Sequence, residues 1–153
     1  TMANLNSDSQ IVLSGTREAV AAAERAAVEA GGKAVVLNVA GAFHSPLMAP
    51  ARERLATLLQ EVAFATPALP VLSNVTGAPH AADGAAIRET MLRQVTEPVR
   101  WMSCVRAAGA QTFIEFGPGK VLSGLIKRID RQNLVANVQD ATSLESVADI
   151  ASA

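Results

Sequence analysis

The chain has 153 residues, of which 50% are hydrophobic and 18% are charged, and its formal net charge is -1. A chain of this length can bury a sizeable core as one compact domain, and the low charge content excludes a disordered tail. The balanced charge, the 3% of aromatic residues and the lack of tyrosine argue against a nucleic-acid partner. No apolar run approaches the roughly 20 residues of a transmembrane helix, so we expect a soluble, cytoplasmic protein without a membrane partner.

The hydrophobic patterns predict strands that alternate with helices along the chain. The predicted strands are 10–14, 33–39, 71–75, 112–116 and 134–138, and the predicted helices are 16–30, 47–62, 87–95, a short one from 98, 120–131 and 143–153. This alternation is typical of an α/β fold with a parallel sheet that helices cover on both faces.

Local signals define the first helix best. Thr16 can cap its N-terminus, Glu18 suits the positive end of the helix dipole, and Gly31-Gly32 ends it. Small apolar residues at three- and four-residue spacing predict one buried stripe: Ala19, Val20, Ala23, Ala26, Ala27 and Ala30. The helix 47–62 has its predicted buried face at Leu55, Leu58, Leu59 and Val62.

Two histidines are candidates for chemistry. His44 follows a predicted strand and precedes a helix, where ligands bind in α/β sheets, and it could act as a general base near neutral pH. A loop histidine without a chemical role is the alternative. His80, between Pro79 and Ala81, is predicted to be solvated.

The stretch Gly117-Pro118-Gly119-Lys120 does not have the spacing of a phosphate-binding loop. It is either a structural strand-to-helix turn or a turn whose amides and Lys120 face an anion. The single cysteine, Cys104, excludes an internal disulfide and is predicted to be buried and structural. No spacing of residues suggests a metal site, and no serine stands in a Gly-x-Ser-x-Gly elbow.

Several short motifs resemble, in order, the C-terminal half of bacterial malonyl-CoA:acyl carrier protein transacylases. They are Asn4-Leu5-Asn6-Ser7, Gln10 to Gly15, Gly41-Ala42-Phe43-His44-Ser45-Pro46-Leu47-Met48, Ser73 to Gly77, Gln94 with Pro98-Val99-Arg100-Trp101, and Glu115 to Leu122. Each motif is weak alone, but together they cover nearly the whole chain and are specific.

The resemblance implies a ferredoxin-like small subdomain inserted into a hydrolase-like α/β acyltransferase domain. Residues 1–39 would be the second half of the small subdomain, and residues 40–153 the C-terminal part of the large domain. Thr1 would then mark a cut within the small subdomain.

The resemblance also implies a reaction: transfer of a malonyl group from malonyl-CoA to a serine and then to the phosphopantetheine thiol of acyl carrier protein, in fatty acid biosynthesis. His44 would be the base, oriented by the backbone carbonyl of Gln94, and Phe43 would favour malonyl over methylmalonyl. Contacts to the coenzyme A or pantetheine chain are implied for Asn4, Asn6, Lys33 and Val121. No cofactor is implied beyond the coenzyme A thioester substrate, and no metal.

Three parts of the family pattern do not occur in this sequence: the glycine loop for the oxyanion hole, the Gly-His-Ser-x-Gly nucleophile segment and the arginine that binds malonate. We therefore expect this chain alone to be inactive and to work with the N-terminal half of the same enzyme. Two alternatives stay open: the acyltransferase portion of a polyketide synthase, and a non-catalytic remnant that binds coenzyme A or carrier protein.

Overall fold

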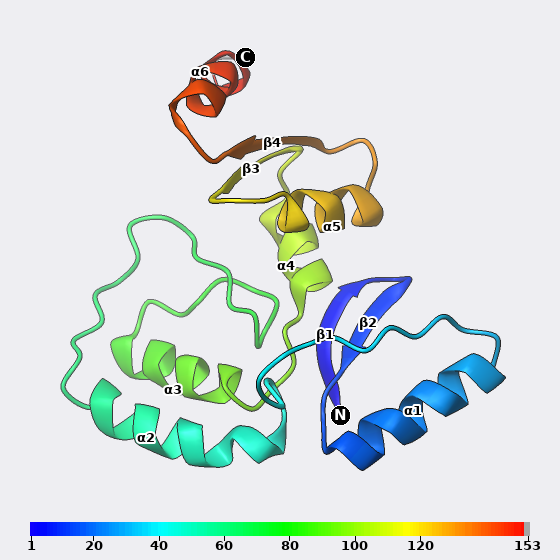
Figure 1. Cartoon of the computed structure of the whole chain (residues 1–153). Helices are drawn as coiled ribbons and strands as arrows, with labels where there is room; N and C mark the ends of the chain where they lie inside the picture. The colour runs from blue at the N-terminus through cyan, green and yellow to red at the C-terminus, as the bar shows by residue number, and fades with distance from the viewer. Residues whose placement is uncertain (152–153) are drawn as a thin grey trace.

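The computed structural model describes residues 1–151 and begins with a β-hairpin followed by a helix (Figure 1). Strands β1 (Met2–Ser7) and β2 (Gln10–Leu13) are antiparallel, with Leu5 opposite Ile11. Helix α1 (Arg17–Glu29) starts where we predicted, because the Thr16 hydroxyl accepts a hydrogen bond from the Ala19 amide at 3.2 Å. The strand β1 is an element that the sequence patterns did not predict.

The middle of the chain forms a pair of packed helices. The short 3-10 helix η1 (Pro46–Met48) leads into α2 (Ala49–Leu59), which packs against α3 (Gly84–Gln94). The Arg88 guanidinium on α3 donates to the carbonyl oxygens of Leu59 and Val62, both at 2.8 Å. One bond reaches the Leu59 carbonyl at the C-terminal end of α2, and the other reaches a carbonyl just beyond the helix.

The C-terminal part is a β-α-β unit with a helix on either side. After α4 (Trp101–Ala108), strand β3 (Thr112–Phe116) runs parallel to β4 (Leu134–Val138), and α5 (Val121–Ile129) connects them. Both strands have the predicted bounds. The terminal helix α6 (Ala141–Ala151) begins two residues before the predicted 143–153, whose last two residues lie outside those that the structure describes.

The N-terminal hairpin is joined to the rest of the chain through residue 99. The Leu5 amide donates to the Val99 carbonyl, and the Val99 amide donates to the Ala3 carbonyl, both at 2.8 Å. In Figure 1, α4 leads from this junction to the β3–β4 unit. Helices α4 and α5 also pack against β1, and the core includes Ala3, Cys104, Val105, Leu125 and Ile126.

The predicted parallel sheet is confirmed in part: the described residues form a parallel pair, β3 and β4, and a separate antiparallel pair, β1 and β2. Residues 33–39, predicted as a strand, are irregular, and Val35 is 70% exposed. Residues 71–75 make only an isolated bridge, between Leu72 and Pro79. Both segments have the β-branched composition of strands, but a strand also needs a neighbour that completes its ladder of hydrogen bonds.

Two predicted apolar helix faces are also wrong in part. No residue of α1 is buried, and of its predicted apolar stripe only Val20, Ala23 and Ala27 are half-buried. On α2, Leu59 is buried as predicted, whereas Leu58 is 69% exposed and Val62 lies beyond the helix end. None of the helices within residues 1–151 combines the length and apolar character that crossing a bilayer requires.

Gly77 provides a sharp test of the packing between the 71–77 turn and α4. Its φ is +68°, and a Cβ placed there would lie 2.4 Å from the Ser103 Cβ. We expect Gly77→Ala to lower the free energy of unfolding by about 2–4 kcal/mol, from backbone strain and a steric clash together. Gly109 has a φ of +60° with open space around it, so Gly109→Ala should cost only about 1 kcal/mol. Urea denaturation measures both, and equal losses would contradict the packing argument.

Candidate active site

The candidate site centres on His44, whose ring contacts the end of a distant helix. Its Nδ1 lies 2.8 Å from the backbone oxygen of Gln94, fifty residues further along the chain. A carbonyl oxygen can only accept, so Nδ1 must carry the proton and Nε2 of the neutral ring is left as the acceptor. This is the arrangement that a general base needs.

The position of Gln94 explains why its carbonyl is available. Gln94 is the last residue of α3, and the last four carbonyls of a helix have no partner within the helix. The C-terminal end of a helix also carries a partial negative charge. The contact therefore orients the imidazole of His44 and fixes the tautomer in which Nε2 is free to accept a proton.

The loop that carries His44 is held by the next residue. Ser45 is 1% exposed; its hydroxyl donates to the Ala42 carbonyl at 2.6 Å and accepts from the Leu47 amide at 3.3 Å. His44 itself has a φ of +57°, a conformation that costs of the order of 1–3 kcal/mol for a residue other than glycine. The buried Ser45 contacts offset that cost and fix the direction of the His44 side chain.

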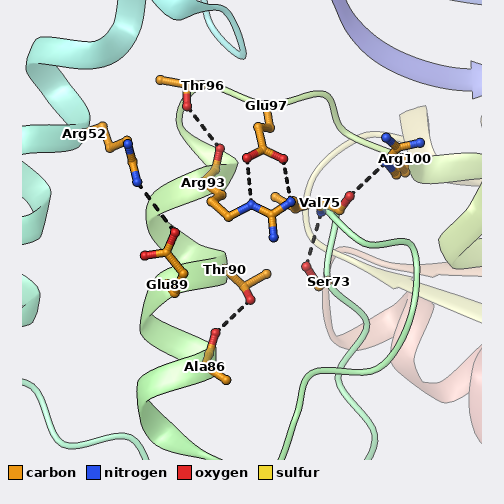
Figure 2. A network of polar contacts seen from close by, with 10 residues as sticks. All are labelled: Arg52, Ser73, Val75, Ala86, Glu89, Thr90, Arg93, Thr96, Glu97 and Arg100. Atoms are coloured by element: carbon orange, nitrogen blue, oxygen red, sulfur yellow. Dashed lines mark hydrogen bonds and ion pairs between the residues drawn. The ribbon is translucent and has the colours of Figure 1, made fainter.

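The turn after α3 is closed by an ion pair, which Figure 2 shows beside Thr96 and Val75. Arg93 Nε lies 2.7 Å from Glu97 Oε1, and Arg93 Nη2 lies 2.8 Å from Oε2. These hydrogen bonds hold the pKa of the Glu97 carboxyl below its usual value and raise the pKa of the Arg93 guanidinium. Sequence reasoning missed this pair, although opposite charges four residues apart were a visible signal.

The other residues implied by the resemblance lie on separate elements. Asn4 and Asn6 are in β1, and Asn6 is 8% exposed. Lys33 lies in the irregular segment after α1, while Val121 begins α5 and is 72% exposed. Phe43, next to His44, is 48% exposed. Among these residues the structure shows one direct contact, between His44 and Gln94, and Phe43 directly precedes His44.

The glycine turn 117–119 is a strand-to-helix connection with its own internal anion. The Glu115 carboxylate accepts hydrogen bonds from the amides of Leu122 and Ser123 and from the Ser123 hydroxyl, at 3.1, 2.8 and 2.6 Å. Glu115 therefore occupies two of the amides that an external anion would need, which favours the structural interpretation of this turn.

Neither Cys104 nor His80 takes part in the His44–Gln94 contact, but His80 and Gln94 line the same hollow. Cys104 is 5% exposed, its thiol donates to the Ser73 carbonyl at 3.4 Å, and burial raises its pKa, so the predicted burial of this cysteine is confirmed. The prediction that His80 is solvated is wrong in part. Its Nδ1 is buried without a hydrogen-bond partner among the described residues, beside a hollow that Phe64, Ile87 and Met91 help to line. The chain reverses direction around Ala78, where the His80 amide donates a hydrogen bond to the Val71 carbonyl.

Comparison with known proteins gives consistent matches over nearly the whole chain. The family described as "Acyl transferase domain" matches residues 1–149. The chain is 43% identical over 148 residues to the malonyl CoA-acyl carrier protein transacylase of Bacillus subtilis, which covers 94% of this chain and 46% of that protein.

Solved structures agree with this match. The transacylase of the same name from Clostridium perfringens superposes with a TM-score of 0.93 at 37% identity, over 99% of this chain and 49% of that one. A malonyl-transacylase in complex with a type II polyketide synthase acyl-carrier protein superposes with a TM-score of 0.92 at 37% identity, over 98% and 50%. The chain thus has an α/β structure like part of these acyltransferases, and it spans about half of their length.

The carboxylate of Glu115 generates a testable pH dependence. Burial alone would raise its pKa, but the hydrogen bonds from Ser123 and Leu122 outweigh burial and lower it. A lowered pKa stabilises the folded state above the ordinary glutamate pKa, and this contribution is lost as the pH falls through the lowered value. We expect Glu115→Gln to reduce the free energy of unfolding by about 1 kcal/mol at pH 7, and by progressively less below pH ~4.5.

Urea denaturation between pH 3 and 7 measures this difference. The exposed Glu53 on α2 supplies the matched control, because Glu53→Gln removes the same charge from a solvent-facing position. If the difference in free energy of unfolding between wild type and Glu115→Gln stays constant over this pH range, the carboxylate charge does not stabilise the turn.

Proposed function

Because the chain belongs to the acyl transferase domain family, we propose that it supplies the general base of a malonyl-CoA:acyl carrier protein transacylase of fatty acid biosynthesis. The observation that carries this proposal is the 2.8 Å contact between His44 Nδ1 and the Gln94 carbonyl, which leaves Nε2 free for a proton. The similarity to proteins named malonyl CoA-acyl carrier protein transacylase supports the choice of substrates.

In the proposed reaction a serine hydroxyl attacks the thioester carbonyl carbon of malonyl-CoA while His44 Nε2 takes its proton. The carbon–sulfur bond breaks, and the proton passes from His44 to the leaving thiolate of coenzyme A. In the second half His44 takes the proton of the phosphopantetheine thiol, whose sulfur attacks the carbonyl carbon of the malonyl-serine ester. The carbon–oxygen bond to serine breaks, and the proton passes from His44 to the leaving serine oxygen. Gln94 keeps the ring in one tautomer throughout, as the third member of a triad does.

Specificity and substrate contacts extend the proposal. Phe43 directly precedes the base, and its ring would restrict space beside the acyl group, so malonyl is preferred over the branched methylmalonyl. Asn4, Asn6, Lys33 and Val121 are proposed contacts to the coenzyme A or pantetheine chain, carried over from the resemblance alone. The reaction as proposed needs no metal and no cofactor beyond the coenzyme A thioester, and its proposed place is the cytoplasm.

The nucleophile and the oxyanion donors are proposed to come from an N-terminal half of the same enzyme. The division of this chain into a small-subdomain part over 1–39 and a large-domain part over 40–153 belongs to the same proposal. The contiguous hairpin and α1 support it. Without nucleophile and oxyanion hole, the 153-residue chain alone should not transfer malonyl groups.

A second candidate is the same transfer within polyketide biosynthesis, and the similarity to the complex with a type II polyketide synthase carrier protein favours it. Transfer rates to a fatty-acid and to a polyketide acyl carrier protein separate the two. A third alternative, a non-catalytic remnant, would bind coenzyme A in calorimetry while the full gene product transfers nothing.

Substitution of the base tests the proposal directly. We expect His44→Ala in the full gene product to lower the rate of malonyl transfer by about 10²–10⁴-fold, which is the usual contribution of a general base. Circular dichroism should show an unchanged fold, since His44 lies on a loop and is partly exposed. Near-normal transfer by this variant would remove His44 from the mechanism.

The neighbouring position provides a matched contrast. Gln94→Ala should leave transfer nearly unchanged, because the contact to His44 uses the main-chain carbonyl and the Gln94 side chain is exposed. The rate is measured with the same carrier-protein assay. A large loss would mean that the amide side chain, and not the carbonyl, contributes to the reaction.

A further inference from the structure

Residues 93–97 form a turn whose two ends are joined by hydrogen bonds and an ion pair. We call this turn the 93–97 ring, and Gln94 lies within it. On the main chain, the Arg93 carbonyl accepts from the amides of Thr96 and Glu97, at 3.0 and 2.9 Å. On the side chains, Arg93 and Glu97 form the two-point ion pair at 2.7 and 2.8 Å. The carbonyl that contacts His44 thus belongs to the residue directly after one end of this ring.

The end of a helix is the part that most readily frays, so a carbonyl at this place is not held by the helix alone. We propose that the Arg93–Glu97 pair is a positioning clamp, which holds the Gln94 carbonyl against Nδ1 of His44 and so keeps the base in its productive orientation. The proposal rests on the proposed function, since it assigns a role in orienting that base. Arg93 and Glu97 touch neither substrate nor reacting atoms.

The exposure of the Arg93–Glu97 pair indicates that it positions the turn and contributes little to the stability of the fold. The two side chains are 40% and 38% exposed, and ion pairs this accessible contribute little to the free energy of unfolding. The planar guanidinium, however, makes two parallel hydrogen bonds that fix direction as well as distance. Variants that lose the pair should therefore fold normally and differ in the geometry of the turn.

The surroundings of the ring strengthen this assignment. Two residues beyond Glu97, Val99 is hydrogen-bonded to β1, and the Arg100 guanidinium donates to the Val75 carbonyl at 2.9 Å (Figure 2). The chain is thus anchored after the turn by these contacts and before it by α3. The Arg93–Glu97 pair is the side-chain link that spans the turn between the two anchors.

The same helix provides a matched control. Arg52 on α2 and Glu89 on α3 form a second ion pair at 3.6 Å, which Figure 2 shows about one helical turn before Arg93. Glu89→Gln removes a carboxylate that acts on Arg93 through its charge alone, and it leaves both hydrogen bonds of the Arg93–Glu97 pair in place. Glu97→Gln and Arg93→Gln each remove one partner of the clamp, and the double variant removes both.

The direct readout is the protonation of the two ring nitrogens of His44. Histidine labelled with ¹⁵N in the full gene product is observed by long-range ¹H–¹⁵N spectra at pH 8.5, with His44→Ala to assign the signals. We expect wild type and Glu89→Gln to carry the proton on Nδ1, and Glu97→Gln and Arg93→Gln to move both nitrogens toward a mixture of tautomers. Unchanged nitrogen shifts in both clamp variants would overturn the proposal.

Kinetics provide the second readout. Each clamp variant should lower kcat about tenfold and leave KM for malonyl-CoA unchanged, because a misplaced base slows the chemical step without weakening substrate binding. The double variant should lose no more than either single variant, since the two side chains act as one contact. Additive losses, or a rise in KM alone, would contradict the clamp.

The two readouts also separate this inference from the proposed function. If the wild-type gene product transfers no malonyl group but the clamp variants change the His44 tautomer, the proposed function fails and the clamp stands. If transfer depends on His44 but the tautomer and kcat are insensitive to Arg93 and Glu97, the clamp fails and the proposed function stands.

Discussion

The hydrogen bond from His44 to the Gln94 carbonyl joins two segments that are fifty residues apart, and each segment is built for it. One segment is a loop in which the buried Ser45 holds a backbone conformation that histidine rarely adopts. The other is the last residue of α3, where a carbonyl lacks its helical partner. A helix end that would otherwise need water thus becomes the group that sets the tautomer of an imidazole.

Unsatisfied helix ends are used in the same way elsewhere in the chain. The Arg88 guanidinium covers the Leu59 carbonyl at the end of α2, and the Glu115 carboxylate covers the amides at the start of α5. In each case a charged side chain from another element completes the hydrogen bonds that the helix cannot make itself. These contacts connect elements whose apolar packing is modest, because several large apolar side chains, such as Leu58 and Phe116, remain exposed.

Local chemistry accounts for the predictions that succeeded. The Thr16 cap, the strands 112–116 and 134–138 and the glycine turn between β3 and α5 all depend on residues near one another in the sequence. The predictions that failed needed distant partners. Residues 33–39 have the composition of a strand but no neighbouring ladder in the structure, and no residue of the alanine stripe of α1 is fully buried.

The sequence by itself determined the family of this chain, the place of His44 after a Gly-Ala-Phe motif and the ends of several helices and strands, because these depend on residue type and short-range spacing. The resemblance implied that the Gln94 carbonyl orients His44, and the tertiary structure places Nδ1 of His44 2.8 Å from that oxygen. Only the tertiary structure decided that Glu115 meets the amides of α5 and that β1 meets Val99. A hydrogen bond depends on distances of a few tenths of an ångström and on direction. Between residues fifty positions apart, those quantities are set by how the helices and loops pack and not by the letters of either segment.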